Sequence, residues 1–145
     1  MSTIYVIKNA GFDITTRHPP LTDYMERVRA SLLVRQLGWD YWIWGFEDLK
    51  DFESDHRDME ELGKGELWTL LVPGHEVKWC NLARLREGRK PVWSWFYPDP
   101  ELIRKTGDTP MALVKAPINP AWVSKRGSAR DAFVKAGLWQ ERGKT

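Results

Sequence analysis

The sequence is poor in cysteine, since Cys80 is the only one among 145 residues. An intramolecular disulfide is therefore excluded, and this usage is typical of proteins from a reducing compartment. No apolar run approaches the roughly 20 residues that a membrane-spanning helix needs, and the first residues lack the basic and apolar segments of a secretory signal. These absences predict a cytoplasmic protein without membrane segments.

The residue patterns of common metal and nucleotide sites are also missing. The three histidines and Cys80 follow no zinc-ligand spacing, because neither Cys-x-x-Cys nor His-Glu-x-x-His occurs. The chain has no Walker loop, no Gly-x-Gly-x-x-Gly and no nucleophile elbow around a serine. We therefore expect no bound metal and no cofactor from these motifs, and we interpret Cys80 as a small buried hydrophobe.

Tryptophan, in contrast, is abundant, with nine residues in the chain. Five of them lie in two stretches, residues 38–46 (GWDYWIWGF) and residues 91–100 (PVWSWFYPDP). Read as strands, both stretches place apolar side chains on both faces, a pattern that is typical of strands covered on both sides. The first stretch is therefore predicted to be a central strand, with residues 92–97 of the second as another strand in the same core.

Two further tryptophans stand apart, in segments near the C-terminus that also carry lysine and arginine. Tryptophan beside a cationic side chain is typical of a binding hot spot, for protein or for nucleic acid. We expect residues 116–127 to form a basic, proline-containing loop and the two rings to be exposed. The predicted binding residues of this region are Trp122, Lys125, Arg126, Arg130 and Trp139.

The net charge of +2 is unevenly distributed. Residues 47–61 hold eight acidic and two basic side chains, whereas residues 84–145 hold thirteen basic and six acidic ones. The apolar residues of the acidic block have helical spacing, which predicts an amphipathic helix with a solvated acidic face. Such a face can also mimic the charge of a phosphate backbone and engage a nucleic-acid-handling protein, as small virus-encoded inhibitors of host defence do. Its candidate contact residues are Asp51, Asp55 and Asp58.

The stretch HEVKW, residues 75–79, carries the one pattern that points to catalysis. On a strand, Glu76 and Lys78 share a face, and a hairpin turning at Pro73-Gly74 places Glu66 on the neighbouring strand. This arrangement resembles the D…E-x-K motif of the PD-(D/E)XK nucleases. The resemblance implies Mg²⁺ held by the carboxylates of Glu66 and Glu76, with Lys78 orienting the water that cleaves a phosphodiester.

Local signals predict the remaining elements. Caps, prolines and glycines mark the helix ends, and β-branched or aromatic runs mark the strands. The expected elements are a strand at residues 3–9, a helix at 22–37 capped by Thr22 and closed by Gly38, a short helix between Asn81 and Gly88, a helix between Asp99 and Gly107, a strand at 111–115, and a helix that begins at Ser128 and ends at Gly137.

This order of elements predicts an α+β protein with one domain over residues 1–145. We expect a mixed or antiparallel sheet of about five strands packed with three to five helices. The charge and aromatic patterns favour a binding module over an enzyme, with a protein as the partner: a small inhibitor or adaptor of a nucleic-acid-handling machine. Two alternatives stay open, namely direct nucleic-acid binding through the basic C-terminal half and the Mg²⁺-dependent nuclease.

Overall fold

The computed structural model describes residues 1–16, 21–55, 59–88 and 91–139. Within these ranges the backbone forms seven α-helices and seven strands, and every strand pairing is antiparallel. The α+β prediction with antiparallel pairing is thus confirmed, but the strands divide into two sheets instead of joining in one of about five. No helix in the described ranges is long and apolar enough to span a bilayer.

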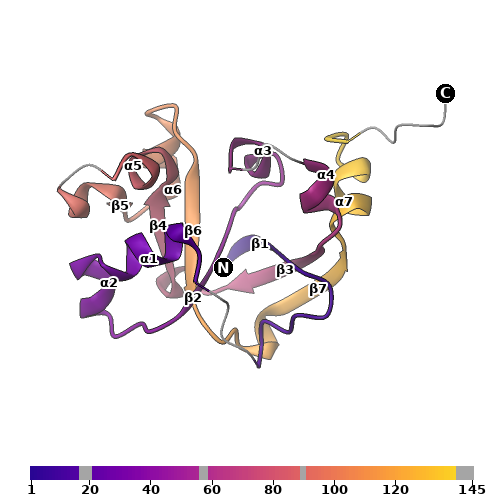
Figure 1. The fold of residues 1–145 in the computed structure, drawn as a ribbon, viewed down its shortest axis with the longest axis horizontal. Helices are drawn as coiled ribbons and strands as arrows, with labels where there is room; N and C mark the ends of the chain where they lie inside the picture. Colours follow the sequence, from indigo (N-terminus) through magenta and orange to yellow (C-terminus); the bar gives the residue numbers. More distant parts are fainter. Residues whose placement is uncertain (17–20, 56–58, 89–90, 140–145) are drawn as a thin grey trace.

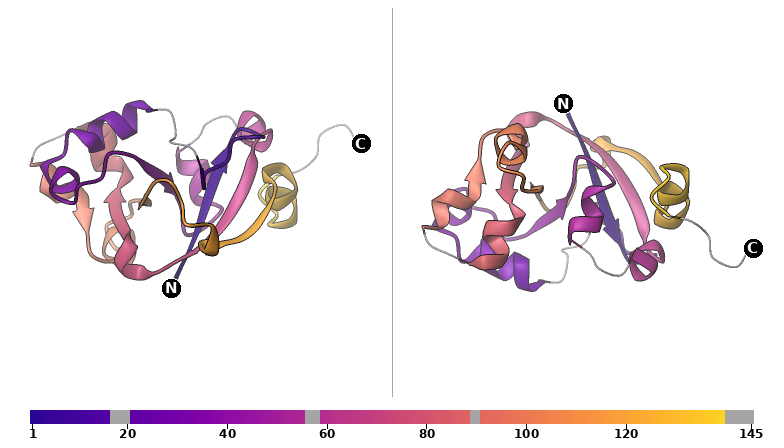
Figure 2. Two further views of the ribbon diagram at one scale, coloured as in Figure 1. Left: turned by 90° about the horizontal axis from the view of Figure 1, so that it is seen from below. Right: turned by 90° about the horizontal axis from the view of Figure 1, so that it is seen from above.

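The two sheets stand side by side in Figure 1, and Figure 2 shows them from below and above. One sheet has three strands in the order β1 (Ser2–Lys8), β3 (Glu66–Val72) and β7 (Val123–Ser128). The other has four strands in the order β2 (Trp42–Gly45), β6 (Pro110–Lys115), β4 (Val77–Asn81) and β5 (Phe96–Tyr97).

The predicted hairpin of residues 66–79 is wrong, because β3 and β4 belong to different sheets. Strand β3 is hydrogen-bonded on one side to β1 and on the other to β7, so no edge remains for β4. The 3₁₀-helix η1 (Gly74–Glu76) follows Pro73 and leads the chain from one sheet into the other.

The sheets touch where β1 crosses the end of β2. Tyr5 and Phe46 exchange two backbone hydrogen bonds, with N···O distances of 2.7 and 3.0 Å. Gly45 permits this approach, since a Cβ there would collide with the carbonyl oxygen of Tyr5. Residues 38–46 are therefore not a central strand as predicted: β2 lies at the edge of its sheet, and β1 covers that edge.

Two clusters of buried side chains form the core, and each combines residues from both sheets. One contains Trp42 of β2 with Leu67 of β3, and the other contains Ile43 of β2 with Trp68 of β3. Neighbouring side chains of β2 thus point into different clusters, as strand geometry requires. Both faces of this aromatic strand are apolar because each points into a buried cluster, the Trp42 cluster including residues of helices as well as of strands.

The helix predicted at residues 22–37 is broken into α1 (Asp23–Arg29) and α2 (Leu32–Gln36). Its predicted ends are confirmed: Thr22 Oγ1 accepts a hydrogen bond from the Met25 N–H, and Gly38 has φ +72°. The break lies at Ser31, whose backbone is extended and begins the second helix. Serine is a weaker helix former than the leucines that follow it, although its hydroxyl makes no capping hydrogen bond here, and the local periodicity did not reveal this interruption.

The acidic block forms two short helices, α3 (Asp51–Asp55) and α4 (Met59–Gly63), on either side of residues 56–58, which lie outside the described residues. The predicted apolar stripe does face the core. Phe52 is buried, and the partly buried side chains that pack beside it are Leu49, Met59 and Leu62.

Three more helices begin at the predicted caps. Side-chain oxygens of Asn81, Asp99 and Ser128 each accept a backbone N–H of the following turn. The helices are α5 (Leu82–Glu87), α6 (Pro100–Arg104) and α7 (Ala129–Lys135), as Figure 1 shows. The predicted strand at 92–97 is instead mostly the 3₁₀-helix η2 (Val92–Trp95), and the predicted loop at 116–127 contains most of β7.

Candidate protein-binding site

Two large apolar side chains are exposed in one shallow groove, which we call the Trp93 groove. Trp93 is 69% exposed and Leu32 is 70% exposed. The groove has a volume of about 420 Å³, and its lining consists of Ala30, Leu32, Leu33, Gln36, Val92 and Trp93. Exposed tryptophan and leucine that share a groove are a feature of protein-binding surfaces.

Local backbone geometry explains why Trp93 points outward. In a strand, Trp93 and Trp95 would share a face, and the alternation of the sequence predicts just that. The chain instead forms the 3₁₀ turn η2 (Val92–Trp95), in which Trp95 is buried and Trp93 is exposed. Pro91 begins this turn, and Ser94 Oγ donates a 2.7 Å hydrogen bond back to its carbonyl.

The exposure of Leu32 follows from the break at Ser31. Leu32 is the first residue of α2, whereas Val34 of the same helix is buried. A continuous helix over residues 22–37 would have carried Leu32 on the buried stripe of Met25 and Val28. Because of the break, the side chain of Leu32 lies in the groove and not in the core.

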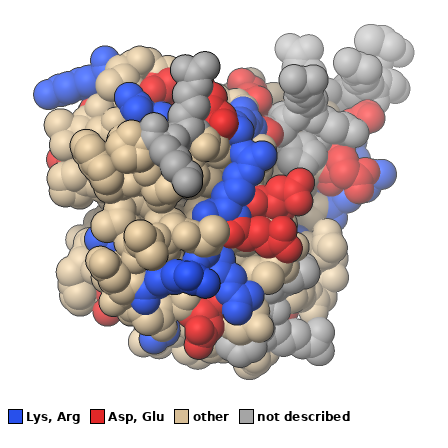
Figure 3. Space-filling model, turned by 60° about the vertical axis from the view of Figure 1, so that its left-hand side comes forward, with Lys and Arg blue, Asp and Glu red and all other residues tan. Residues whose placement is uncertain are grey.

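Arginines flank the Trp93 groove. Arg84 donates a 3.4 Å hydrogen bond to the hydroxyl of Ser94, next to Trp93 in the chain. Arg29 and Arg35 are exposed and directly neighbour the lining residues Ala30 and Gln36 in sequence. Figure 3 turns the side of α1, α2 and α5 forward and shows Lys and Arg side chains in a band that borders a broad uncharged area on one side and Asp and Glu side chains on the other. Cationic side chains thus lie close to the groove.

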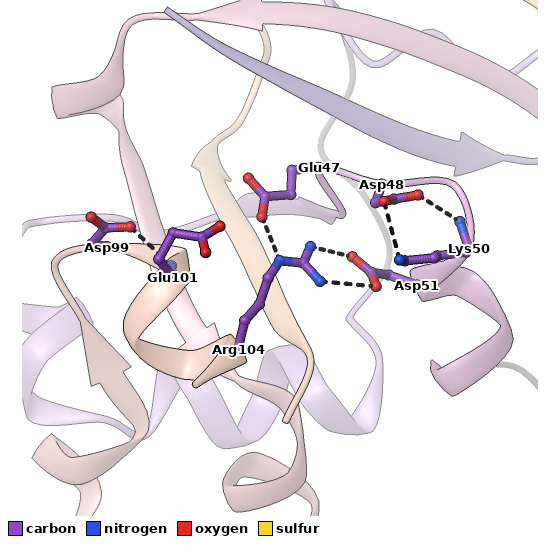
Figure 4. A network of polar contacts seen from close by, with 7 residues as sticks. All are labelled: Glu47, Asp48, Lys50, Asp51, Asp99, Glu101 and Arg104. Carbon is purple, nitrogen blue, oxygen red and sulfur yellow. Dashed lines mark hydrogen bonds and ion pairs between the residues drawn. The ribbon is translucent and has the colours of Figure 1, made fainter. Parts of the chain in front are cut away.

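Asp51, a predicted partner contact, lies in an internal ion-pair network instead (Figure 4). Its Oδ2 accepts a 2.8 Å hydrogen bond from Arg104 Nη2, and Glu47 Oε1 accepts one of 2.9 Å from Arg104 Nε. The Asp51 hydrogen bond is the main reason that the pKa of Arg104 is raised above its usual range, and the Glu47 bond adds to it. The predicted exposure of Asp51 is corrected: the residue is 5% exposed and ties α3 to α6.

Asp55 is enclosed in the same way. Its carboxylate lies 3.1 Å from Arg86 Nη2 and is 3% exposed at the side chain. Arg86 also donates to the carbonyl of Ser54 and to the hydroxyl of Tyr24, so it joins α3 to α1 and α5. Asp58 lies outside the described residues. The clearly exposed carboxylates of the two acidic helices are those of Glu53, Glu60 and Glu61.

The structure does not bring the three nuclease candidates together. Glu66 begins β3 and pairs with Arg126 at 2.7 Å, whereas Glu76 lies in η1 beyond the other end of that strand. The seven residues of β3 separate the two by roughly 20 Å at about 3.3 Å per residue. Lys78 is exposed on β4, in the other sheet. Among the described residues no group of carboxylates, histidines and cysteines is arranged to hold a metal ion.

The two outlying tryptophans are half-buried instead of exposed. Trp122 packs against the core cluster of Trp68, and the ring of Trp139 lies against Gly63, with the Arg130 guanidinium 5.6 Å from its centroid. Lys125 and Arg126 lie on strand β7, not in a loop. Arg126 stacks 3.9 Å above the Trp68 ring.

The exposed tryptophan that sequence reasoning missed is therefore Trp93. The available signal was the pair Pro91 and Ser94, three residues apart, because proline and serine are both common in turns and proline is disfavoured within strands. Cys80 agrees with its prediction: it is fully buried in β4, and this burial raises the pKa of its thiol to about 12.

The fold and the groove define the class of this protein only broadly, as an α+β protein of two antiparallel sheets with an exposed apolar groove. No family model matches the chain, and neither the curated proteins nor the solved structures contain a match to it.

Proposed function

We propose that this protein is a non-enzymatic binding module that docks a protein partner at the Trp93 groove. The observation that carries the proposal is that Trp93 and Leu32 are both largely exposed and line the same groove. Tryptophan is enriched among residues that dominate binding energy, especially where smaller contacts exclude water around it. A protein that binds a partner without catalysing a reaction can act as a small inhibitor or adaptor.

The partner is expected to insert apolar side chains between Trp93 and Leu32 and to present carboxylates to the flanking arginines. Burying one such apolar side chain contributes about 1.5–3 kcal/mol. The arginines then select the partner and speed its approach more than they add affinity. The finer prediction, a partner that handles nucleic acid, rests on the acidic block and on its exposed residues Glu53, Glu60 and Glu61. We place this interaction in the cytoplasm, in line with the single cysteine.

The test compares capture of proteins from the native host lysate by the wild type and by Trp93→Ala. Loss of a hot-spot tryptophan costs about 2 kcal/mol or more, so a specific partner should be recovered at least about tenfold less by the variant. Leu71→Ala is the matched control, because Leu71 is also an exposed leucine but lies on β3. Arg35→Glu should weaken capture as well.

Circular dichroism and thermal melting confirm that each variant is folded. The proposal is overturned when Trp93→Ala and Leu71→Ala recover the same proteins as the wild type in equal amounts. It is also overturned when the two variants lose the same partner equally, because the loss would then not depend on the groove.

A further inference from the structure

The two sheets have four edge strands, namely β1 and β7 in one and β2 and β5 in the other. In the described part of the chain these edges differ in what covers them. The edges of β1 and β2 meet at Tyr5 and Phe46. Strand β5 has only two residues, Phe96 and Tyr97. Strand β7 has six residues, and every one after Val123 is exposed. Figures 1 and 2 show β7 on the outer side of β3, on the far side of the molecule from α2.

The hydrogen-bond pattern tells which backbone groups of β7 point outward. The Ala129 N–H donates to the Gly65 carbonyl at 3.1 Å. Hydrogen-bonded pairs alternate along an antiparallel ladder, so Gly127 and Lys125 also bond to β3, whereas the N–H and C=O of Arg126 point away from it. The same alternation turns Tyr5 outward at the opposite edge of this sheet, where Phe46 takes both of its backbone groups.

A groove of about 510 Å³ runs beside this edge, between the face of the sheet and α7. Its floor includes Tyr5, Leu67 and Thr69, and β7 contributes Lys125 and Gly127 to its border. A Cβ at Gly127 would meet open space, so the border is low at that point. An added strand would direct every second side chain toward this groove.

Charge identifies the occupant. Lys125 and Lys135 line the groove together with one carboxylate, that of Asp131, so the groove side of this edge carries a net positive charge. On the opposite face of β7, Arg126 is already paired with Glu66 at 2.7 Å. Pairing of β7 with a second copy of itself would bring the lysines of the two copies together, which is unfavourable. A strand with carboxylates on its groove-facing side is complementary to this edge.

We propose that the outer edge of β7 binds an extended acidic peptide segment as an additional strand. Its backbone pairs with Arg126, its alternate side chains enter the groove between Tyr5 and Lys135, and the carboxylates among these side chains face Lys125 and Lys135. This site is distinct from the Trp93 groove and does not depend on it.

The probe is a synthetic peptide of eight residues that alternates valine and glutamate, so its carboxylates all lie on one face of the strand. Amide hydrogen exchange of the full-length protein is followed by NMR. At a peptide concentration of about ten times Kd, exchange of the Arg126 amide should slow about tenfold, since only about a tenth of the molecules remain unbound. The Lys125 and Gly127 amides, which already bond to β3, should change far less.

Two controls separate strand addition from simple charge attraction. The same peptide with methylated backbone nitrogens keeps its charge but loses its donors, and it should bind at least about tenfold more weakly. Lys125→Glu should weaken binding, whereas Lys78→Glu, at an exposed lysine of β4, should not. Trp93→Ala should bind the peptide normally even where the proposed function fails.

The inference is overturned when the methylated peptide binds equally well, or when the Arg126 amide is unaffected at saturation. It is also overturned when an oligothymidylate of eight nucleotides binds in a Lys125-dependent manner and the peptide does not. That result would assign the edge to single-stranded nucleic acid.

Discussion

The two tryptophan-rich stretches, residues 38–46 and 91–97, have similar compositions but different structures. In the first, Trp42 and Phe46 are fully buried, and the strand between them is held by β6 and by β1. In the second, Trp93 is 69% exposed, and the chain makes a 3₁₀ turn before only two residues join the sheet. A run of aromatics is thus core where partner strands reach it, and surface where a local turn forms first.

The largest expected effect concerns the two tryptophans themselves. Trp42→Ala should lower the free energy of unfolding by about 3–5 kcal/mol, because it removes a fully buried ring and leaves a cavity. Trp93→Ala should change it by less than about 0.5 kcal/mol, since that ring contacts little. Urea unfolding of both variants measures the difference, and equal losses would contradict the assignment of one ring to the core and one to the surface.

The next effect tests what holds the first stretch in place. Gly45→Ala should destabilise the protein by about 1–3 kcal/mol, because the added Cβ collides with the Tyr5 carbonyl where the two sheets meet. Gly127→Ala is the control, with open space around its Cβ and an expected change within about 0.5 kcal/mol. If urea unfolding finds the two variants equally stable, the close crossing of β1 over β2 is refuted.

The next prediction concerns Cys80 of β4, because its backbone pairs with Phe96, where the second tryptophan-rich stretch joins the sheet. Burial raises the pKa of its thiol from 9.0 to about 12, so the folded state keeps a proton that the unfolded state loses. Stability should therefore fall as pH rises above 9, by about 1 kcal/mol at pH 10. Unfolding at pH 8 and pH 10, compared between the wild type and Cys80→Ala, isolates this contribution, and parallel pH profiles would rule it out.

The smallest effect concerns the turn that exposes Trp93. Ser94→Ala removes the hydrogen bond to the Pro91 carbonyl and should cost about 0.5–1 kcal/mol. It should also loosen η2, so acrylamide quenching of tryptophan fluorescence is expected to change. Thr106→Ala removes a comparable side-chain bond to the Ile103 carbonyl and serves as the control, for which quenching should be unchanged. Identical quenching in the two variants would show that Ser94 does not position Trp93.

Much of the local structure was determined by the sequence alone. The caps at Thr22, Asn81, Asp99 and Ser128 were predicted correctly because each depends on a hydrogen bond that spans two or three residues. The apolar stripe around Phe52 was recognised for a similar reason, since helical spacing records which face is buried but not what buries it.

The tertiary structure decided which strands pair and which side chains remain outside. β3 was placed in a hairpin with β4, but β1 and β7, from the two ends of the chain, occupy both of its edges. The carboxylates of Asp51 and Asp55 were expected at the surface, but arginines from α6 and α5 enclose them. Composition records that a side chain is apolar or charged. Whether that side chain is buried depends on which distant segment of the chain packs against it, and the spacing of residues within the sequence does not specify that contact.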